Sequence, residues 1–351
     1  MNTWDDCLLL IATSHLNHAT PASFMTHVNS RNDYTEIACQ IVEEADVDVL
    51  LGGGTDYFSA PQISTMVSNG YSAVYNRAEL ASVTSGRVFG LFSTSHMDYE
   101  YDRDYSLQPS IAEMTNKSIE LLSQDTDGFF LLVEGSRIDL AAHAEDKVRN
   151  ALDTIAFDEA VDVAMDYVKN HNNTILIVTA DHETQGLVIL SHNLNSELPA
   201  DLVSETDKRT LRAERVNNVT VDWTATFHTA QDVPLFAFGD AFLDLTEDLA
   251  IDNTDIHTLM KDFYLGNPLN ETEITTSTTT TTSTATTDTS STTTTTDTTT
   301  TTSGTETTTG STSTKGPTST PGVPLDSSLL LAVSAGAAII ILVALVLIKR
   351  R

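Results

Sequence analysis

The residues best suited to chemistry follow directly after an apolar run. The run Phe129 to Glu134 reads FFLLVE, and Asp139 and His143 come a few residues later. A continuously apolar run is typical of a buried strand in a parallel sheet, and α/β proteins build their sites at the carboxyl ends of such strands. Asp139 and His143 are one helical turn apart, so a helix beginning near Ile138 would turn both side chains the same way. The two could bind one metal ion, with Glu134 close by.

Two further segments place acid and imidazole groups beside apolar runs. The run Thr174 to Thr179 is followed by Asp181 and His182, and His228 lies just before the run Val233 to Phe238. Zinc suits such a mixture of nitrogen and oxygen ligands. A single histidine beside a strand usually has a structural or solvated role. The prediction of a metal site therefore depends on the whole set, which contains more acid and imidazole than packing requires.

Three of these segments, in this order, resemble the C-terminal metal-binding segments of the alkaline phosphatase family. They are VEGSRIDLAAH, TADHET and FHTAQDVP. The likeness continues upstream through HATPASFMTHVNSR, LLGGGTDYF, GLFSTSHMDYEYDR and PSIAEMTNKSIELL, and it spans roughly residues 8 to 265. Taken jointly, these motifs are highly specific.

The resemblance implies a phosphomonoester hydrolase that uses two zinc ions and one magnesium ion and works through a phosphoserine intermediate. Magnesium, a hard cation, prefers oxygen ligands, whereas zinc accepts imidazole as well. The ligands implied by the matching positions are Asp139, His143 and His228 for the first zinc, Asp181 and His182 for the second, and Thr20 and Glu134 for the magnesium.

Two other residues of the HATPASFMTHVNSR segment have implied roles. Arg31 matches the arginine that clamps the phosphate, because a planar guanidinium can hold two phosphoryl oxygens at once. His18 stands where some relatives carry Asp, so it would support the magnesium site without binding the ion. The resemblance also implies a homodimer.

The resemblance implies two residues that no segment of this chain matches, the nucleophilic Ser and an early Asp between the magnesium and the second zinc. Both should precede Cys7, and there Asp5 and Asp6 follow no apolar strand. We expect either a fragment of an active phosphatase or a short relative that cannot do the chemistry. The first is favoured, since the run Leu8 to Ala12 is too short for a signal peptide although the C-terminus suits the cell surface. A smaller departure is Gln185, where Gly is common.

The C-terminal part is expected to contain a stalk and a membrane anchor. Residues 271–324 are rich in Thr and Ser and cannot form a core, which predicts a disordered, O-glycosylated stalk. Within residues 325–351, the apolar run Leu329 to Ile348 is about as long as a membrane-spanning helix, and the basic residues after it predict a cytoplasmic C-terminus. The catalytic domain would then be extracellular or lumenal. A GPI-anchor signal is the alternative, but such signals usually end apolar. N-glycosylation is permitted at Asn116, Asn172, Asn218 and Asn270.

The composition excludes one class of partner. The chain has 49 acidic and 18 basic residues, which gives a formal net charge of −31. Nucleic acid is therefore not an expected partner, because its phosphate backbone would repel the chain. Phosphate esters could still bind where divalent ions and Arg31 dominate the local field. Two cysteines, Cys7 and Cys39, define no disulfide framework, and one bond or two buried free thiols are both compatible with the sequence.

The alternation of strand and helix patterns predicts an α/β fold over residues 1–270, with a mostly parallel central sheet flanked by helices. This is also the architecture that the resemblance implies. Without an N-terminal contribution to the sheet, we expect uncovered strand edges and poor stability. The clearest helices are Ser110–Leu122 and Ala151–His171, and strands are expected at Cys7–Thr13, Asp48–Leu51, Ala73–Tyr75, Val88–Phe92, Phe129–Glu134, Thr174–Thr179 and Pro234–Phe238.

Three functions are compatible with these observations. The leading hypothesis is a membrane-anchored ectophosphatase that releases phosphate from diverse monoesters. The others are an inactive metal-binding surface protein and another reaction of the same superfamily, such as diester hydrolysis. Arg31 and the magnesium ligands with Thr20 favour monoesters, because a doubly charged phosphoryl group needs the additional positive charge.

Overall fold

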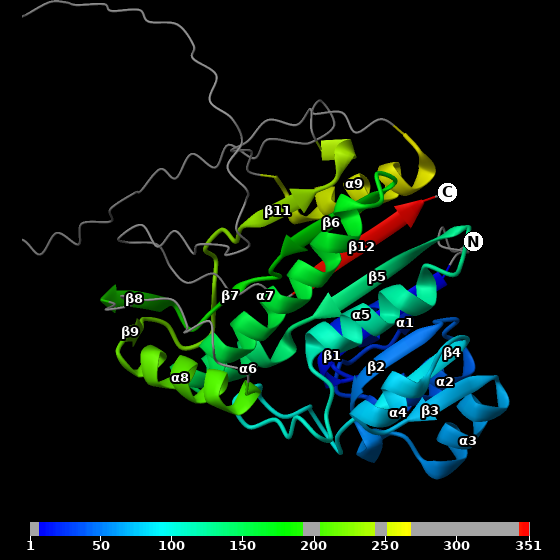
Figure 1. Ribbon diagram of the computed structural model, residues 1–351, viewed down its shortest axis with the longest axis horizontal. Helices are drawn as coiled ribbons and strands as arrows, with labels where there is room; N and C mark the ends of the chain where they lie inside the picture. Colours follow the sequence, from blue (N-terminus) through cyan, green and yellow to red (C-terminus); the bar gives the residue numbers. More distant parts are fainter. Residues whose placement is uncertain (1–6, 192–203, 243–250, 268–343, 351) are drawn as a thin grey trace, which may run out of the picture. The chain divides into compact units, whose positions relative to one another are not determined.

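A central sheet of eight strands organises the fold (Figure 1). The computed structural model describes residues 7–191, 204–242, 251–267 and 344–350. The strand order is β11-β6-β12-β5-β1-β2-β4-β3. Neighbouring strands from β5 to β3 run parallel, whereas β11 and β12 pair antiparallel with their neighbours. The predicted mostly parallel sheet is thus confirmed. The strands are β1 (Cys7–His15), β2 (Val49–Gly53), β3 (Tyr71–Val74), β4 (Arg87–Leu91), β5 (Gly128–Glu134), β6 (Thr174–Thr179), β11 (Leu235–Phe238) and β12 (Ala344–Arg350).

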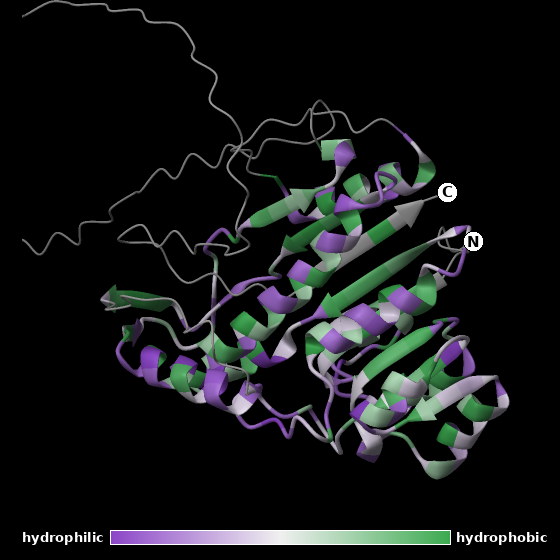
Figure 2. Cartoon of the chain, viewed as in Figure 1, coloured by the Kyte–Doolittle hydropathy of each residue, from purple (hydrophilic) through white to green (hydrophobic). Residues whose placement is uncertain are grey.

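The strands in the middle of the sheet, such as β2 and β5, are buried along their whole length because helices cover the sheet on both sides. Alternate residues of one strand enter different cores: Leu9 packs with α4 to α7, whereas Leu10 packs with α1, α2, α3 and α9. Figure 2 shows β2 and β5 in the colour of hydrophobic residues, while the helices around them carry both hydrophobic and hydrophilic residues. The helices are α1 (Ala19–Met25), α2 (Tyr34–Glu43), α3 (Ala60–Ser68), α4 (Arg77–Ser82), α5 (Ile111–Leu122), α6 (Ser136–His143), α7 (Lys147–Lys169), α8 (Glu205–Asn217) and α9 (Asn253–Leu265), with 3-10 turns at Thr55–Tyr57 and Asp240–Phe242.

Local capping explains where the two clearest helices begin. Ser110 and Glu113 form a capping box at the start of α5, as the predicted helix over Ser110–Leu122 requires. The long helix α7 starts earlier than the predicted Ala151, because the side chain of Asp146 accepts hydrogen bonds from the main-chain N–H groups of the first turn. A pattern of apolar residues alone does not reveal this N-cap, because the capping residue is polar and precedes the pattern.

The prediction of a membrane-spanning helix over Leu329–Ile348 differs from what the structure describes. Residues 344–350 form β12, which is paired antiparallel with β5 on one side and with β6 on the other. Leucine, valine and isoleucine suit an interior strand as well as a membrane helix, and this position satisfies the backbone groups of two neighbouring strands. β12 therefore leaves no open edge between β5 and β6. No helix in the described part of the chain is long and apolar enough to cross a membrane.

Several segments with sequence-based predictions lie outside the described residues, and one prediction about the cysteines can be compared with the structure. The predicted stalk at 271–324, residues 329–343 of the apolar run and Asn270 all lie outside the described residues. Of the two cysteines, Cys39 carries a free, half-buried thiol.

Two small antiparallel pairs lie beside the main sheet. β8 (Leu187–Ser191) pairs with β9 (Thr220–Trp223), and β7 (Glu183–Thr184) pairs with β10 (His228–Thr229). None of the four strands was predicted from the sequence. β7 and β10 have two residues each and are too short to show an alternation of apolar and polar residues. The pair of β7 with β10 matters most, since it brings a distant segment back to the end of β6.

Candidate metal centre

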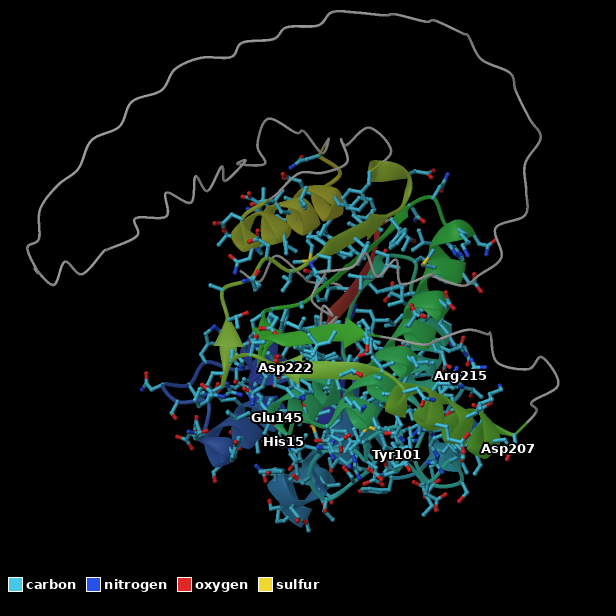
Figure 3. The ribbon with its side chains drawn as sticks, turned by 90° about the vertical axis from the view of Figure 1, so that its left-hand side faces the viewer. His15, Tyr101, Glu145, Asp207, Arg215 and Asp222 are labelled. Carbon is cyan, nitrogen blue, oxygen red and sulfur yellow. The ribbon has the colours of Figure 1, made fainter. Side chains whose placement is uncertain are left out.

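The candidate ligands gather at one edge of the sheet because their strands run parallel. Ala12 of β1 is in register with Glu134 of β5. Across β12, Ala344 is in register with both Glu134 and Thr179, so β5 and β6 end at the same level. The segments that follow β1, β5 and β6 therefore begin side by side. Figure 3 looks onto the side of the molecule that carries β8 and β9, and it labels His15 at the end of β1 and Glu145 just after α6.

Glu134 is a buried carboxyl group at the end of β5. It is 3% exposed, and burial raises its pKa to about 7. The nearby hydroxyl groups of Ser136 and Thr20 lower the pKa of Glu134 and so partly oppose that rise. Its Oε2 is buried without a hydrogen-bond partner. An orphaned carboxylate oxygen beside a threonine hydroxyl fits an oxygen-preferring divalent cation, so the predicted magnesium ligands Thr20 and Glu134 are brought together.

Asp139, His143 and His228 form a compact cluster. The Nε2 atoms of His143 and His228 are 3.0 Å apart, and Asp139 Oδ1 lies 3.4 Å from the first and 3.9 Å from the second. Ligands about 2.1 Å from a tetrahedral zinc ion are roughly 3.4 Å from one another. The three atoms thus already have nearly the spacing that one zinc ion requires. In the described part of the chain they are the one group of three or more His, Cys, Asp or Glu side chains with such spacing.

The helix α6 supplies two members of this cluster and the β7–β10 pair supplies the third. The separation of Asp139 and His143 by one helical turn aligns them, as predicted. His228 is placed beside them because β10 pairs antiparallel with β7, with His228 opposite Thr184. Burial and the nearby His182 lower the pKa of His228, while Asp139 opposes that shift. A neutral imidazole is the form that binds a metal ion.

Gln185 shapes the turn that carries β7 into this arrangement. Its φ of 66° lies in the left-handed region, which explains why the resemblance favours glycine there. Gln185 compensates through its contacts. Its main-chain N–H donates to the Phe227 carbonyl at 2.7 Å, and its Nε2 donates to the His143 carbonyl at 3.3 Å. The residue therefore ties the segment before His228 to the end of α6.

Asp181 and His182 lie directly beside the cluster. His182 Nε2 is 3.2 Å from Asp181 Oδ2, and the His182 ring stacks on the His228 ring with centroids 3.4 Å apart. The predicted second pair of zinc ligands is thus adjacent to the first group. It consists of two residues in the described part of the chain, so it is less complete than the cluster around Asp139.

Arg31 and His18 lie next to each other near the start of α1. Arg31 Nη2 donates to His18 Nε2 at 3.5 Å, and the Arg31 side chain is exposed. Burial, and then the charge of Arg31, lower the pKa of His18, while Asp139 and Asp181 act in the opposite direction. An exposed guanidinium that uses one of its five donors here leaves others for an anion.

Sequence reasoning missed a group of buried aromatic residues around His18. His15 is 2% exposed, stacks on Tyr57 with centroids 4.2 Å apart, and lies 4.8 Å from the His96 ring and 5.4 Å from the His18 ring. Burial is the main cause that lowers the pKa of His15 to about 3 and of His96 to about 4. The sequence does show that His15 and His96 each follow an apolar run, which could have marked them as candidates. Their proximity could not be predicted, because it depends on the pairing of parallel strands in the sheet.

The protein resembles proteins of known family over most of its described length. The family model described as alkaline phosphatase matches residues 8–210. Alkaline phosphatase 3 of Bacillus subtilis is 30% identical over 307 residues, which covers 70% of this chain and 65% of the relative. Alkaline phosphatase 4 of the same organism is 31% identical over 285 residues, which covers 66% of this chain and 62% of the relative. The chain thus spans slightly less than two thirds of these relatives.

Solved structures give the same result. A cold-active alkaline phosphatase from the psychrophile Shewanella sp. superimposes with a TM-score of 0.62 at 30% identity, covering 73% of this chain and 75% of that one. The alkaline phosphatase of the Antarctic bacterium TAB5 gives a TM-score of 0.55 at 26% identity, covering 68% and 66%. A TAB5 variant with Mg bound in its M3 site gives 0.54 at 26% identity, covering 67% and 66%. The chain therefore belongs to the alkaline phosphatase family.

Proposed function

We propose that this protein acts in the metal-dependent hydrolysis of phosphate monoesters. The observation that carries the proposal is the cluster of Asp139, His143 and His228, whose ligand atoms lie 3.0 to 3.9 Å apart. Such spacing between one carboxylate and two imidazoles is close to the spacing of three ligands around one zinc ion. Membership of the alkaline phosphatase family supports this activity among the reactions that such a cluster could perform.

Two zinc ions and one magnesium ion are proposed as cofactors, and when bound they would supply the Lewis-acid charge that stabilises a transferring phosphoryl group. The residues suit these ions chemically. Thr20 and the orphaned oxygen of Glu134 offer hard oxygen ligands for magnesium. The first zinc would be held by the cluster around Asp139, and the second by Asp181 and His182. The mutant TAB5 enzyme with Mg bound in its M3 site supports the proposal of a magnesium site in this chain.

Arg31 is proposed to bind the phosphate of the substrate. Its exposed fork can form parallel hydrogen bonds to two phosphoryl oxygens, and the resulting charge compensation grows as negative charge builds up in the transition state. His18 accepts one hydrogen bond from the guanidinium and so limits its orientation. In a chain with a net charge of −31, such a local positive group is needed to attract an anionic ester.

The second candidate function is metal binding without turnover. It is favoured by one structural observation, that the cluster around Asp139 offers three ligand atoms, whereas among the described residues only Asp181 and His182 are available for the second zinc position. In this case the cluster around Asp139 would bind zinc while no phosphate is released. Hydrolysis of a phosphodiester in place of a monoester would point to another reaction of the superfamily.

Metal content and turnover, measured together on the full chain, test the proposal. The parent chain is loaded with zinc and magnesium, its metal content is determined by mass spectrometry, and release of p-nitrophenol from its phosphate monoester and diester is followed. Asp139→Ala and His228→Ala should each lower the zinc content by about one ion and abolish turnover. His27→Ala, at an exposed histidine away from the cluster, is the matched control and should change neither quantity.

The possible results separate the candidates clearly. Zinc binding with monoester hydrolysis supports the proposed enzyme. Zinc binding without hydrolysis supports the inactive metal-binding protein. Full activity in either ligand variant would refute the assignment of the cluster.

Location and assembly are separate proposals. Anchorage in the cell membrane by a single helix is supported by the apolar run Leu329–Ile348 and the basic residues after it, with the catalytic domain on the extracellular or lumenal side. It requires β12 to leave the sheet. Extraction of membranes at high pH would leave a spanning protein in the pellet and would release one held only by surface contacts. The homodimer implied by the family can be tested by light scattering.

A further inference from the structure

Thr184 lies where three of the proposed zinc ligands meet. It belongs to β7, is 0% exposed, and stands in register with His228 of β10. Its Oγ1 is 2.6 Å from Asp139 Oδ1 and 3.3 Å from His182 Nδ1. These neighbours come from β10, from α6 and from the end of the β6 segment. One buried hydroxyl thus joins parts of the chain that are far apart in sequence.

The hydrogen of the Thr184 hydroxyl has only one useful acceptor. An ionised carboxylate can only accept, so this hydrogen points to Asp139. The hydroxyl oxygen can then only accept from the His182 ring, which requires a hydrogen on Nδ1. The main-chain oxygen of Glu183, 3.2 Å from the same Nδ1, requires it as well. Both contacts therefore place the ring hydrogen of a neutral His182 on Nδ1.

This arrangement leaves the lone pair of His182 Nε2 free. Nε2 lies 3.2 Å from Asp181 Oδ2, so two electron-rich atoms face each other. A cation bound by both atoms would remove the repulsion between them. Histidines that bind a metal ion commonly donate their other ring N–H to an oxygen, which orients the ring and fixes its tautomer. Thr184 and the Glu183 carbonyl provide these oxygens for His182.

We propose that Thr184 is a positioning residue that couples the two zinc positions. It orients Asp139 for the first ion by donating a hydrogen bond to its carboxylate. It holds the His182 ring for the second ion by accepting from Nδ1. The inference rests on the proposed function as far as metal binding is concerned, but it does not require turnover by this chain.

Zinc affinity in three variants of the full chain tests this role. Thr184→Val keeps the shape of the side chain and removes the hydroxyl, whereas Thr184→Ser keeps the hydroxyl. Thr229→Val is the matched control, because Thr229 donates a similar hydrogen bond to the buried carboxylate of Glu183 in the same pair of strands, and Glu183 is not a proposed ligand. Zinc dissociation constants are measured by competition with a chromophoric chelator, and thermal unfolding is measured in EDTA.

The expected result is a loss of zinc affinity in one variant only. Thr184→Val should weaken both zinc ions by about 10- to 100-fold, the usual effect of removing a group that orients a metal ligand. Thr184→Ser should bind zinc nearly as the parent does. Thr229→Val should keep the parental affinity even if its unfolding temperature in EDTA falls as much as that of Thr184→Val.

Two results would overturn the proposal for Thr184 alone. One is parental affinity for both ions in Thr184→Val, and the other is an equal loss of affinity in Thr229→Val, which would show a general effect on the hairpin. Absence of zinc binding in the parent would overturn it together with the metal assignment. Zinc binding without phosphate release would refute the proposed hydrolase and, with the expected pattern of affinities, would support the role of Thr184.

Discussion

Replacing His15 by phenylalanine should remove part of the acid sensitivity of the fold. His15 is 2% exposed, its Nδ1 is buried without a hydrogen-bond partner, and its ring packs between Tyr57 and His96. A charged imidazole is costly in such a place, and burial, followed by His96 and His18, lowers the pKa of His15 to about 3. Phenylalanine can keep the stacking on Tyr57 and cannot be protonated.

The magnitude follows from the difference between the folded and the unfolded pKa. The unfolded chain binds a proton at His15 near pH 6.5, while the folded chain stays neutral there until about pH 3. The stability due to the neutral ring is thus complete above pH 6.5 and is lost as the pH falls from there toward pH 3. At pH 5 the loss is about 2 kcal/mol. This pH lies about 1.5 units below the unfolded pKa, and each unit corresponds to about 1.4 kcal/mol of unfolding free energy. This value changes little if the folded pKa is one unit higher.

Urea unfolding at pH 7 and pH 5, followed by circular dichroism in EDTA, measures this effect without a contribution from metal binding. The free energy of unfolding of His15→Phe should fall between the two pH values by about 2 kcal/mol less than that of the parent. His27→Phe, at an exposed imidazole, should leave the pH difference as it is in the parent. If His15→Phe and the parent lost the same stability, a buried neutral His15 would be refuted.

Two further predictions concern the substrate and the sheet. Arg31→Ala should raise the dissociation constant of inorganic phosphate by about 10- to 100-fold, because it removes hydrogen bonds between charged groups. The constant is measured by calorimetry on the metal-loaded chain. An unchanged constant would contradict the proposal that Arg31 binds the phosphate. Deletion of residues 334–351 should increase the aggregated fraction in size-exclusion chromatography relative to the parent, since it removes β12 and leaves the edges of β5 and β6 unpaired. A product with the parental elution profile and melting temperature would show that β12 does not support the sheet.

The sequence by itself determined most of the main sheet and half of the candidate centre. Apolar runs located β1, β5 and β6 to within two residues at each end, because strands covered on both faces must be apolar throughout. The same reasoning placed Glu134 at a strand end. The separation of Asp139 and His143 by one helical turn was enough to align them on α6. Strand positions and the alignment of two residues on one helix depend on neighbouring residues only, so the spacing of residues in the sequence is enough to predict them.

Only the tertiary structure decided which groups share a site. His228 lies 85 residues from His143 in the sequence, and the two-residue pair of β7 with β10 brings their Nε2 atoms to 3.0 Å. The role inferred for Thr184 and the low pKa of His15 likewise depend on burial and on neighbours from other elements. The run Leu329–Ile348 predicts a helix by its length and composition, whereas residues 344–350 are paired with β5 and β6 in the sheet, a placement that depends on partners distant in the sequence. Hydrogen-bond partners and burial arise from folding of the whole chain, so a local pattern cannot contain them.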